Sequence, residues 1–349
     1  PNLDRHFEHI EQYRTTNRTP RPGHASYASF QKYGEWDDAI GAGFFSGRYT
    51  STLVAAGAVA KRILKAHGIE IFAYVKEAAG VRAPEMEYDL IRKQVEAFKQ
   101  LRRDYDLLYN MVYTEKRITP EMRFVEKVAA LGEIEKMIPD LEAKKAFNRE
   151  EAQEKYGVHP VMNCPDVETA EAMRQKIVEI RDSGDSSGGV VELIVTGVPA
   201  GLGEPCFEKL DGKLARMMSI GTVKSVEVGA GLGVKDMTGS ECNDQRFMKD
   251  DKVAFTGNNA GGVTGGLATG QPLVVRLGVK PTPTIAKPQQ TIDKVSLEDA
   301  ELAAVTRRDP TIVARIWPVA EAFTGLVLLD QLMMYRGWQA VAEPIQKKS

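Results

Sequence analysis

A glycine-rich segment in the last third of the chain constrains the fold most. Residues 258–270, NNAGGVTGGLATG, hold five glycines in thirteen positions. Such a stretch makes a poor helix or strand interior, but it lets the backbone approach a ligand closely because no Cβ obstructs it. The apolar run Leu273–Val279 and the segment Lys280–Thr284, KPTPT, follow directly. We therefore expect a strand ending in a rigid loop whose lysine and hydroxyls suit a phosphate group.

Other apolar runs are also separated by glycine-rich turns, so they predict further strands. Between helices and strands there is no regular alternation, and this irregular order favours an α+β fold over a doubly wound sheet. The further predicted strands are Ile69–Val75, Val190–Thr196 and Val223–Val228. Gly229–Gly233, GAGLG, lacks the full dinucleotide-binding fingerprint and is interpreted as a turn.

Three helices are predicted outside the strand-rich parts. Thr50–His67 is rich in alanine and leucine and is followed by Gly68, a common helix stop. Asp166 suits the N-cap of a helix from Val167 to about Arg181. The last helix is Thr311–Tyr335, with Pro318 as a possible kink.

Residues 84–156 differ in composition from the rest of the chain. They are dense in Glu, Lys, Arg, Leu and Met and poor in glycine. This pattern predicts two or three amphipathic helices whose charged faces are solvated. We interpret the whole chain, 1–349, as a single domain that carries 84–156 as a helical insertion.

Composition excludes several classes of protein. With 349 residues, 43% hydrophobic and 27% charged, the chain has the make-up of a soluble globular protein. A formal net charge of -2 gives no reason to expect nucleic-acid binding. The three cysteines are far apart and form no CxxC cluster, so neither a zinc site nor a disulfide framework is expected. No apolar run reaches the length of a membrane span, and the polar residues 1–14 do not resemble a signal peptide.

Two further segments carry candidate functional side chains. The loop Arg21–Tyr27, RPGHASY, presents His24, and a loop histidine is more often functional than one in a helical core. Phe45–Arg48, FSGR, places an arginine just before a helix, where it can bind an anion or cap a helix end. Arg307–Pro310, RRDP, suggests Asp309 at the N-cap and Pro310 at N1 of the last helix, where an anion is also favoured.

Taken together and in order, these segments resemble chorismate synthase. The match includes RPGHASY, FSGRYTSTLVAAGAVAK, GDSSGGVVELIVTGVPAGLGEP, MMSIGTVKSVEVG, GSECND, NNAGGVTGGLATGQPLVVRLGVKPTPTI and RRDPTIVAR. It covers most of the chain outside 84–156. Each motif alone is weak, but the set is specific.

The resemblance implies a fold and a reaction. The fold would be a β-α-β sandwich with sheets packed around a helical core. The reaction would be the anti-1,4-elimination of phosphate from 5-enolpyruvylshikimate 3-phosphate to give chorismate, the last step of the shikimate pathway. It would need reduced FMN, with NADPH a candidate reductant. A cytoplasmic homotetramer is implied, with neither nucleic acid nor membrane as partner.

The resemblance also assigns roles residue by residue. His24 would tune or protonate the reduced flavin, and Asp309 would assist flavin N5 in taking the substrate proton. Arg48 would hold the substrate, with Arg21 and Arg315 as further anion-binding candidates. The implied flavin contacts are Phe44, Phe45, Ser46, Gly221, Thr222, Gly265, Lys280, Pro281, Thr282, Pro283, Thr284 and Arg307.

Several positions depart from the family pattern. Phe44 stands where an arginine is usual, Tyr49 where a glutamate is usual, and Arg308 where a histidine is usual. The chain starts at Pro1 without the family's GESHG-type motif, so it is expected to be either a fragment of a longer product or a degenerate member. Two alternatives to the family reaction therefore remain: a flavin-dependent oxidoreductase, and a non-catalytic subunit.

Overall fold

The computed structural model describes residues 18–36, 45–104, 119, 121–123, 125–133, 149–303 and 309–346. The chain divides into two compact units, and each is described by itself. The first unit comprises residues 1–82 and 175–349, and the second comprises residues 83–174. Candidate functional residues fall in the first unit.

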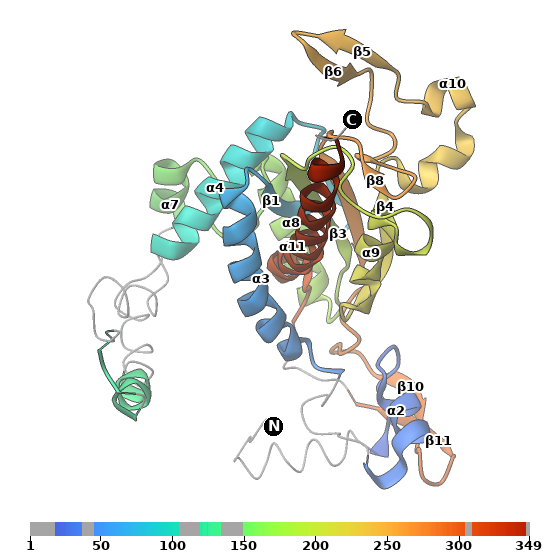
Figure 1. Ribbon diagram of the computed structural model, residues 1–349. Coiled ribbons are helices and arrows are strands. Elements are labelled where there is room, and N and C mark those ends of the chain that lie inside the picture. Colours follow the sequence, from blue (N-terminus) through green and yellow to red (C-terminus); the bar gives the residue numbers. More distant parts are fainter. Residues whose placement is uncertain are drawn as a thin grey trace. The chain divides into compact units, whose positions relative to one another are not determined.

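A five-stranded antiparallel sheet forms the centre of the first unit (Figure 1). Its strand order is β2-β1-β3-β9-β4. The sequence predicted four of these strands, and all four are confirmed, two of them with the predicted bounds. The strands are β1 (Glu70–Ala78), β2 (Val81–Arg82), β3 (Gly189–Thr196), β4 (Val223–Val228) and β9 (Leu273–Val279).

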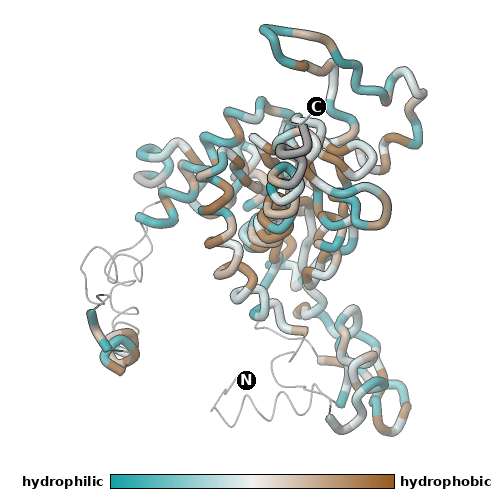
Figure 2. Tube along the Cα trace, viewed as in Figure 1, coloured by the Kyte–Doolittle hydropathy of each residue, from teal (hydrophilic) through white to brown (hydrophobic). Residues whose placement is uncertain are grey.

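The inner strands of this sheet are covered on both faces. Consecutive residues of β1 and β3 are buried, including Phe72 and Ala73 on one strand and Leu193 and Ile194 on the other. A strand buried on both faces needs apolar residues at successive positions, which explains why the sequence shows continuous apolar runs instead of alternation. Hydrophobic positions gather accordingly on the central strands and on the helix in front of them (Figure 2).

Two helices, α3 (Thr50–Ala66) and α11 (Val313–Gln346), pack side by side against the sheet (Figure 1). Small residues allow the contact, because a Cβ on Gly57 would lie 2.4 Å from the Cα of Ala322. The end of α3 agrees with the prediction, since Gly68 follows with φ 79° and donates to the Lys65 carbonyl at 3.0 Å.

Helix α11 begins later and ends later than predicted. It runs through Pro318 and past Tyr335 to Gln346. By length and composition, its part Val313–Ala340 could cross a membrane, with a mean hydropathy of 1.2. That hydropathy belongs to an 18-residue stretch of the helix, of which 56% is buried, and α11 contacts α3, β1 and β3, as a core helix does.

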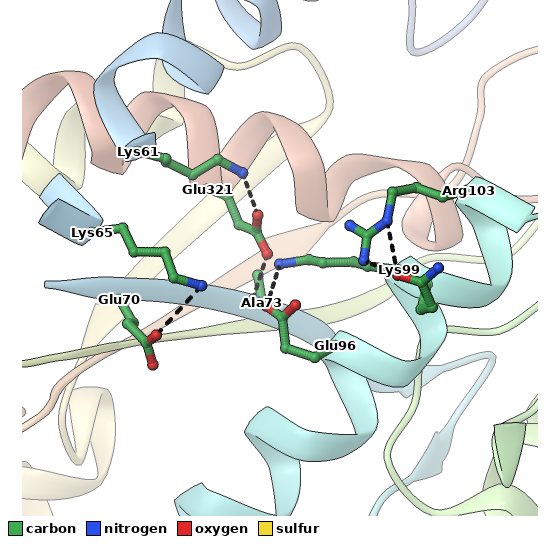
Figure 3. A network of polar contacts seen from close by, with 9 residues as sticks. Lys61, Lys65, Glu70, Ala73, Glu96, Lys99, Arg103 and Glu321 are labelled. Atoms are coloured by element: carbon green, nitrogen blue, oxygen red, sulfur yellow. Dashed lines mark hydrogen bonds and ion pairs between the residues drawn. The ribbon is translucent and has the colours of Figure 1, made fainter. Parts of the chain in front are cut away.

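An ion pair with a buried carboxylate joins the helical layer to the sheet (Figure 3). Glu321 on α11 is fully buried and accepts from Lys61 Nζ of α3 at 2.6 Å. Its other oxygen, Oε1, accepts the backbone N–H of Ala73 on β1 at 3.0 Å. One carboxylate thus satisfies both a lysine and a strand amide, which is the condition for burying a charge at tolerable cost.

A ladder of polar side chains crosses four strands of the sheet. Tyr74, Glu192, Arg276 and Glu227 are successive register partners on β1, β3, β9 and β4. Tyr74 Oη donates to Glu192 Oε1 at 2.5 Å, and Arg276 reaches Glu192 at 3.4 Å and Glu227 at 3.6 Å. Shifting any of the four strands by one residue would send its member to the opposite face, so the ladder specifies the register.

Smaller elements surround the sheet in the first unit. The turn predicted at Gly229–Gly233 is confirmed for residues 229 and 230, where Gly229 has φ 60°, but from Gly231 the chain forms the 3₁₀ helix Gly231–Asp236. A Cβ on Gly229 would lie 2.0 Å from the Asn259 carbonyl oxygen, so only glycine fits there. The helices are α2 (Ser26–Tyr33), α9 (Leu210–Ala215) and α10 (Gly239–Cys242), and the paired strands are β5 (Arg246–Lys249) with β6 (Lys252–Phe255), β7 (Val263–Thr264) with β8 (Leu267–Ala268), and β10 (Gln289–Ile292) with β11 (Asp299–Leu302).

The described regular elements of the second unit are helices, joined by loops. Its helix α4 (Tyr88–Asp104) buries one apolar face and exposes charges on the other, as the sequence predicted for this region. The buried residues Ile91, Val95, Phe98 and Leu101 recur every three or four positions. The described residues 125–133 are also helical, as is α7 (Arg149–Tyr156).

Helix α8 (Val167–Asp182) spans the boundary of the two units. Its predicted N-cap is confirmed, because Asp166 Oδ1 accepts the Thr169 N–H at 2.8 Å. Antiparallel strands and separate helices without regular alternation make the whole an α+β fold, as predicted.

Candidate active site

The loop before α2 presents His24 and Arg21. The His24 N–H donates to the Arg21 carbonyl at 3.1 Å, and the Arg21 N–H donates to Ser26 Oγ at 3.2 Å. Gly23 has φ 70°, a conformation that glycine adopts without strain. These contacts close the loop into a compact turn and hold both side chains on it.

Hydrogen-bond donors approach both ring nitrogens of His24, and the shorter contact indicates the tautomer. The Ser26 N–H donates to Nδ1 at 3.1 Å, so Nδ1 is an acceptor and a neutral ring carries its proton on Nε2. Nε2 lies 3.4 Å from Arg21 Nη2, and a guanidinium can only donate. Two donors therefore face the same space, which suits a carboxylate, a phosphate or another hydrogen-bond acceptor.

A pocket of about 390 Å³ opens beside this loop. That volume is within the range of small-molecule sites, roughly 300–1,000 Å³. Three segments that are far apart in the sequence line it, namely residues 23–25, residues 218–224 and Lys280. Predicted site residues His24, Gly221, Thr222 and Lys280 are thereby brought together.

The wall formed by Gly221 and Thr222 has two unusual features. A Cβ on Gly221 would meet no atom within 4 Å, so the backbone there is open to a ligand. Thr222 has φ 77°, which is rare for a threonine, and its Oγ1 is a buried atom without a hydrogen-bond partner. Strained residues and unsatisfied hydroxyls are more common at binding sites than elsewhere.

The 280–284 loop links this wall to the His24 loop. Lys280 donates its backbone N–H to the Thr222 carbonyl at 3.0 Å and its Nζ to the Gly23 carbonyl. Arg21 Nη1 donates to Thr284 Oγ1 at 3.2 Å. The pocket is therefore lined by the cations Lys224 and Lys280, and Arg21 lies beside its His24, an arrangement that favours an anionic ligand.

Asp309 is attached to the same loop through its main chain. Thr282 Oγ1 donates to the Asp309 carbonyl at 2.7 Å, and the Asp309 carboxylate pairs with Arg315 at 3.2 Å. The predicted N-cap role of Asp309 is wrong, because α11 starts only at Val313 and the Val313 N–H bonds Thr311 Oγ1 at 3.3 Å. The Asp309 carboxylate is thus left outside the helix, about half exposed.

Comparison with known proteins decides the family. The sequence model described as Chorismate synthase matches residues 5–333. The chain belongs to the chorismate synthase family. A chorismate synthase of Acetivibrio thermocellus is 38% identical over 98% of this chain and 72% of its own length. One of Methanococcoides burtonii is 38% identical over 90% of this chain and 69% of its own length.

A solved chorismate synthase structure confirms the fold. It matches with a TM-score of 0.56 and 24% identity, covering 88% of this chain and 68% of its own. Both the resemblance read from the motifs and the α+β fold class are therefore confirmed.

Some residues expected from the chorismate synthase pattern lie away from the pocket lining. Ser46 Oγ accepts the Arg48 N–H at 3.3 Å and thereby caps the 3₁₀ helix Gly47–Tyr49 that leads into α3. Phe45 and the Arg48 side chain are exposed. None of these three lines the pocket. Phe44 and Arg307, also expected from the pattern, lie outside the described residues.

Two other expected chorismate synthase contacts have evident structural roles. Gly265 sits in the tight turn between β7 and β8 with φ 64°, and it does not line the pocket. Pro281 and Pro283 stiffen the 280–284 loop, and the Cβ of Pro283 would lie 3.5 Å from a Cβ on Gly23.

The sequence analysis missed several residues of this candidate site. Met218, Ser219, Ile220 and Lys224 line the pocket beside Gly221 and Thr222. The matched segment MMSIGTVK contains all four residues. Treating the whole segment as part of the site would have included them. Ser186, in the matched segment GDSSGG, was missed as well; it does not line the pocket, but its Oγ donates to the Thr282 carbonyl at 2.7 Å.

Proposed function

We propose that the chain catalyses the chorismate synthase reaction, the anti-1,4-elimination of phosphate from 5-enolpyruvylshikimate 3-phosphate, with reduced FMN as cofactor. The reaction breaks a carbon–oxygen bond to release phosphate and removes a proton from the substrate, which gives chorismate. The chain would be a lyase acting in the cytoplasm as a homotetramer, with NADPH as a candidate reductant and with no nucleic-acid or membrane partner. Family membership supports this proposal.

The observation that carries the proposal is the convergence of His24, Gly221, Thr222 and Lys280 on one pocket. These residues come from three separate segments, and each was assigned to the flavin site by the family pattern. The substrate has two carboxylates and a phosphate, and FMN has another phosphate. A pocket lined by Lys224 and Lys280, with Arg21 next to its His24, fits such anions.

The residues present also fit the cofactor. The open backbone at Gly221 leaves room for a flat ring system. The buried Thr222 Oγ1 has no hydrogen-bond partner in the protein and can bond to a ligand. When bound, reduced FMN would supply a transient electron as phosphate leaves and would take up the substrate hydrogen. The chain's part is to bind, orient and hold protons at defined atoms.

We assign His24 the role of proton donor through Nε2–H, because Ser26 occupies Nδ1. The neighbouring Arg21 adds a positive charge beside this donor and favours an anionic acceptor. Asp309 would assist removal of the substrate proton through its exposed carboxylate, which Arg315 orients. Arg48 remains a candidate substrate ligand.

An anaerobic assay tests the proposal. The chain is mixed with FMN, dithionite and 5-enolpyruvylshikimate 3-phosphate, and chorismate is followed by its absorbance. Wild-type protein should form chorismate, and His24→Ala should lower kcat by about 10²–10⁴-fold, the usual contribution of a general acid. His67→Ala is the matched control, because His67 caps the far end of α3 and does not line the pocket.

The assay also separates the alternatives. FMN binding without chorismate formation would identify a non-catalytic family member. Steady NAD(P)H oxidation with an added acceptor, again without chorismate, would identify a flavin-dependent oxidoreductase. Either result removes the lyase assignment for this chain.

A binding experiment tests the pocket independently of turnover. Lys280→Ala should weaken FMN binding, measured by quenching of flavin fluorescence, because it removes a cation from the pocket wall. Lys252→Ala, on the β6 strand outside the pocket, is the matched control. Equal affinities of the two variants would show that FMN binds elsewhere.

A further inference from the structure

The segment Gly184–Gly189, GDSSGG, lies against two parts of the candidate site. It connects α8 to β3. Its close approach to the 279–286 stretch depends on glycine, because a Cβ on Gly188 would lie 2.3 Å from the Val279 carbonyl oxygen. The Ala286 N–H donates to the Gly184 carbonyl at 2.8 Å, and Lys287 pairs with Asp185 at 2.7 Å. The segment is therefore fixed against both ends of the 280–284 loop.

A directed chain of hydrogen bonds runs from this segment to Asp309. Ser186 Oγ donates to the Thr282 carbonyl at 2.7 Å, and Thr282 Oγ1 donates to the Asp309 carbonyl at 2.7 Å. A parallel bond runs from the Ser187 N–H to the Pro310 carbonyl at 2.8 Å. Residues 309–310 are thus tied to the pocket loop and to the 184–189 segment just before α11 begins at Val313.

We propose that Ser186 and Thr282 are positioning residues. They hold the main chain at Asp309 in a fixed position relative to Lys280, which lines the pocket. Thr282 makes this link with its hydroxyl proton, while Ser186 orients the peptide of Thr282. The assignment rests on the proposed function for its catalytic consequence, but its structural part concerns the ligand-free chain.

The proposal changes the role expected for Thr282. A hydroxyl has one proton, and that of Thr282 is given to the Asp309 carbonyl, so it is not available to a phosphate oxygen. Thr284 differs, because its Oγ1 accepts from Arg21 Nη1 and keeps its proton for another acceptor. Of the two hydroxyls in the loop, Thr284 is the one that can donate to an anion.

Hydrogen exchange of the ligand-free protein is the first test. Thr282→Val keeps the shape of the side chain but removes the donor, and Ser186→Ala removes the first donor. Both should speed amide exchange at Ser187 and in residues 309–315 by about five-fold, as expected for losing roughly 1 kcal/mol of local stability. Thr282→Ser keeps the hydroxyl and should exchange like wild type. Ser183→Ala is the control, because Ser183 Oγ donates to the Ile180 carbonyl at the end of α8.

Unchanged exchange in Thr282→Val, or an equal increase in Ser183→Ala, would overturn the proposal. Kinetics give the second readout. For a positioning role, Thr282→Val should lower kcat for chorismate formation by about 10–100-fold while the Kd for FMN stays within about two-fold. A rise in the FMN Kd with unchanged kcat would instead identify Thr282 as a phosphate contact. If the wild-type chain forms no chorismate, the proposed function fails, and the exchange data still decide whether Thr282 holds Asp309.

Discussion

Gly57 of α3 and Ala322 of α11 touch backbone to backbone, since a Cβ built on Gly57 would lie 2.4 Å from the Ala322 Cα. No flexible side chain stands between the two helices that could move aside. A larger residue at position 57 would force the two helices apart, and both helices pack on the central sheet.

Gly57→Ala should therefore destabilise the protein by about 1–3 kcal/mol, the usual cost of overpacking a core. This result opposes helix propensity, which favours alanine by about 1 kcal/mol. The measurement is chemical denaturation of both proteins. Gly337→Ala in α11 is the matched control, because a Cβ at Gly337 meets no atom within 4 Å, and it should stabilise the protein slightly. A stabilising Gly57→Ala would show that the helices can separate freely.

Glu321→Ala should cost about 3–5 kcal/mol of unfolding free energy, because it leaves Lys61 and the Ala73 N–H without their carboxylate. Glu321→Gln should cost less, since its amide oxygen can still accept the strand N–H. Glu70→Gln serves as the control, because the Lys65–Glu70 pair is 3.7 Å long and exposed, and such pairs contribute at most about 1 kcal/mol. Equal losses for the buried and exposed pairs would contradict the role given to Glu321.

Tyr74→Phe should destabilise the sheet by about 1.5–3 kcal/mol, because it removes a hydrogen bond to a buried carboxylate. A double-mutant cycle with Glu192→Gln measures the coupling, and the tyrosine substitution should cost less in the glutamine background. Tyr335→Phe is the matched control, since Tyr335 Oη donates to the Ala200 carbonyl at 3.3 Å on the surface. Additive effects of Tyr74→Phe and Glu192→Gln would mean that the ladder adds no pairwise stability.

Asp293 should make stability depend on pH in the acid range. The N–H groups of Ser296 and Val295, and then Arg18, hold the pKa of its carboxyl below its ordinary value of 3.8. A lowered pKa in the folded state means that the carboxylate stabilises the fold fully above the ordinary value, and that this stabilisation is lost as pH falls through the folded-state pKa.

Asp293→Asn removes this titration but keeps an oxygen that can accept both N–H groups. The unfolding free energy of wild type should therefore fall more steeply than that of Asp293→Asn below about pH 4. Arg18→Met should keep most of the wild-type slope, because Arg18 is a smaller cause of the shift than the backbone groups. Parallel curves for wild type and Asp293→Asn would show that the carboxylate has no such linkage.

Local patterns in the sequence were enough to find most of the fold. Strands β4 and β9 have the predicted bounds, because valine-rich segments next to glycine indicate both their type and their ends. The start of α11 was missed for a reason that lies elsewhere in the chain. Asp309 looks like an N-cap, but Thr282, twenty-seven residues earlier, binds its carbonyl and keeps this stretch out of the helix.

In the candidate site, too, local sequence patterns predicted some features, while others depend on contacts between distant segments. His24, Gly221, Thr222 and Lys280 could be chosen from motifs, since each belongs to a segment with its own signature. The contacts between site segments could not be predicted in the same way. Arg21 and Thr284, for example, are 263 positions apart, and no local pattern indicates that they are in contact. Ser186 was not predicted because its hydroxyl donates to a main-chain carbonyl. Any residue type at position 282 has that carbonyl, so the sequence gives no signal for the contact.

The strand order β2-β1-β3-β9-β4 also bears on how the chain is made. β3 and β4 leave the ribosome before β9, yet neither contacts the other in the sheet, since β9 lies between them. During synthesis β4 therefore has no strand partner in this sheet until residue 279 has emerged, and one edge of β3 stays open for the same time. Unpaired strand edges can form hydrogen bonds with strands of other chains. While the residues between β3 and β9 are being made, the nascent chain therefore exposes strand edges that are prone to aggregation.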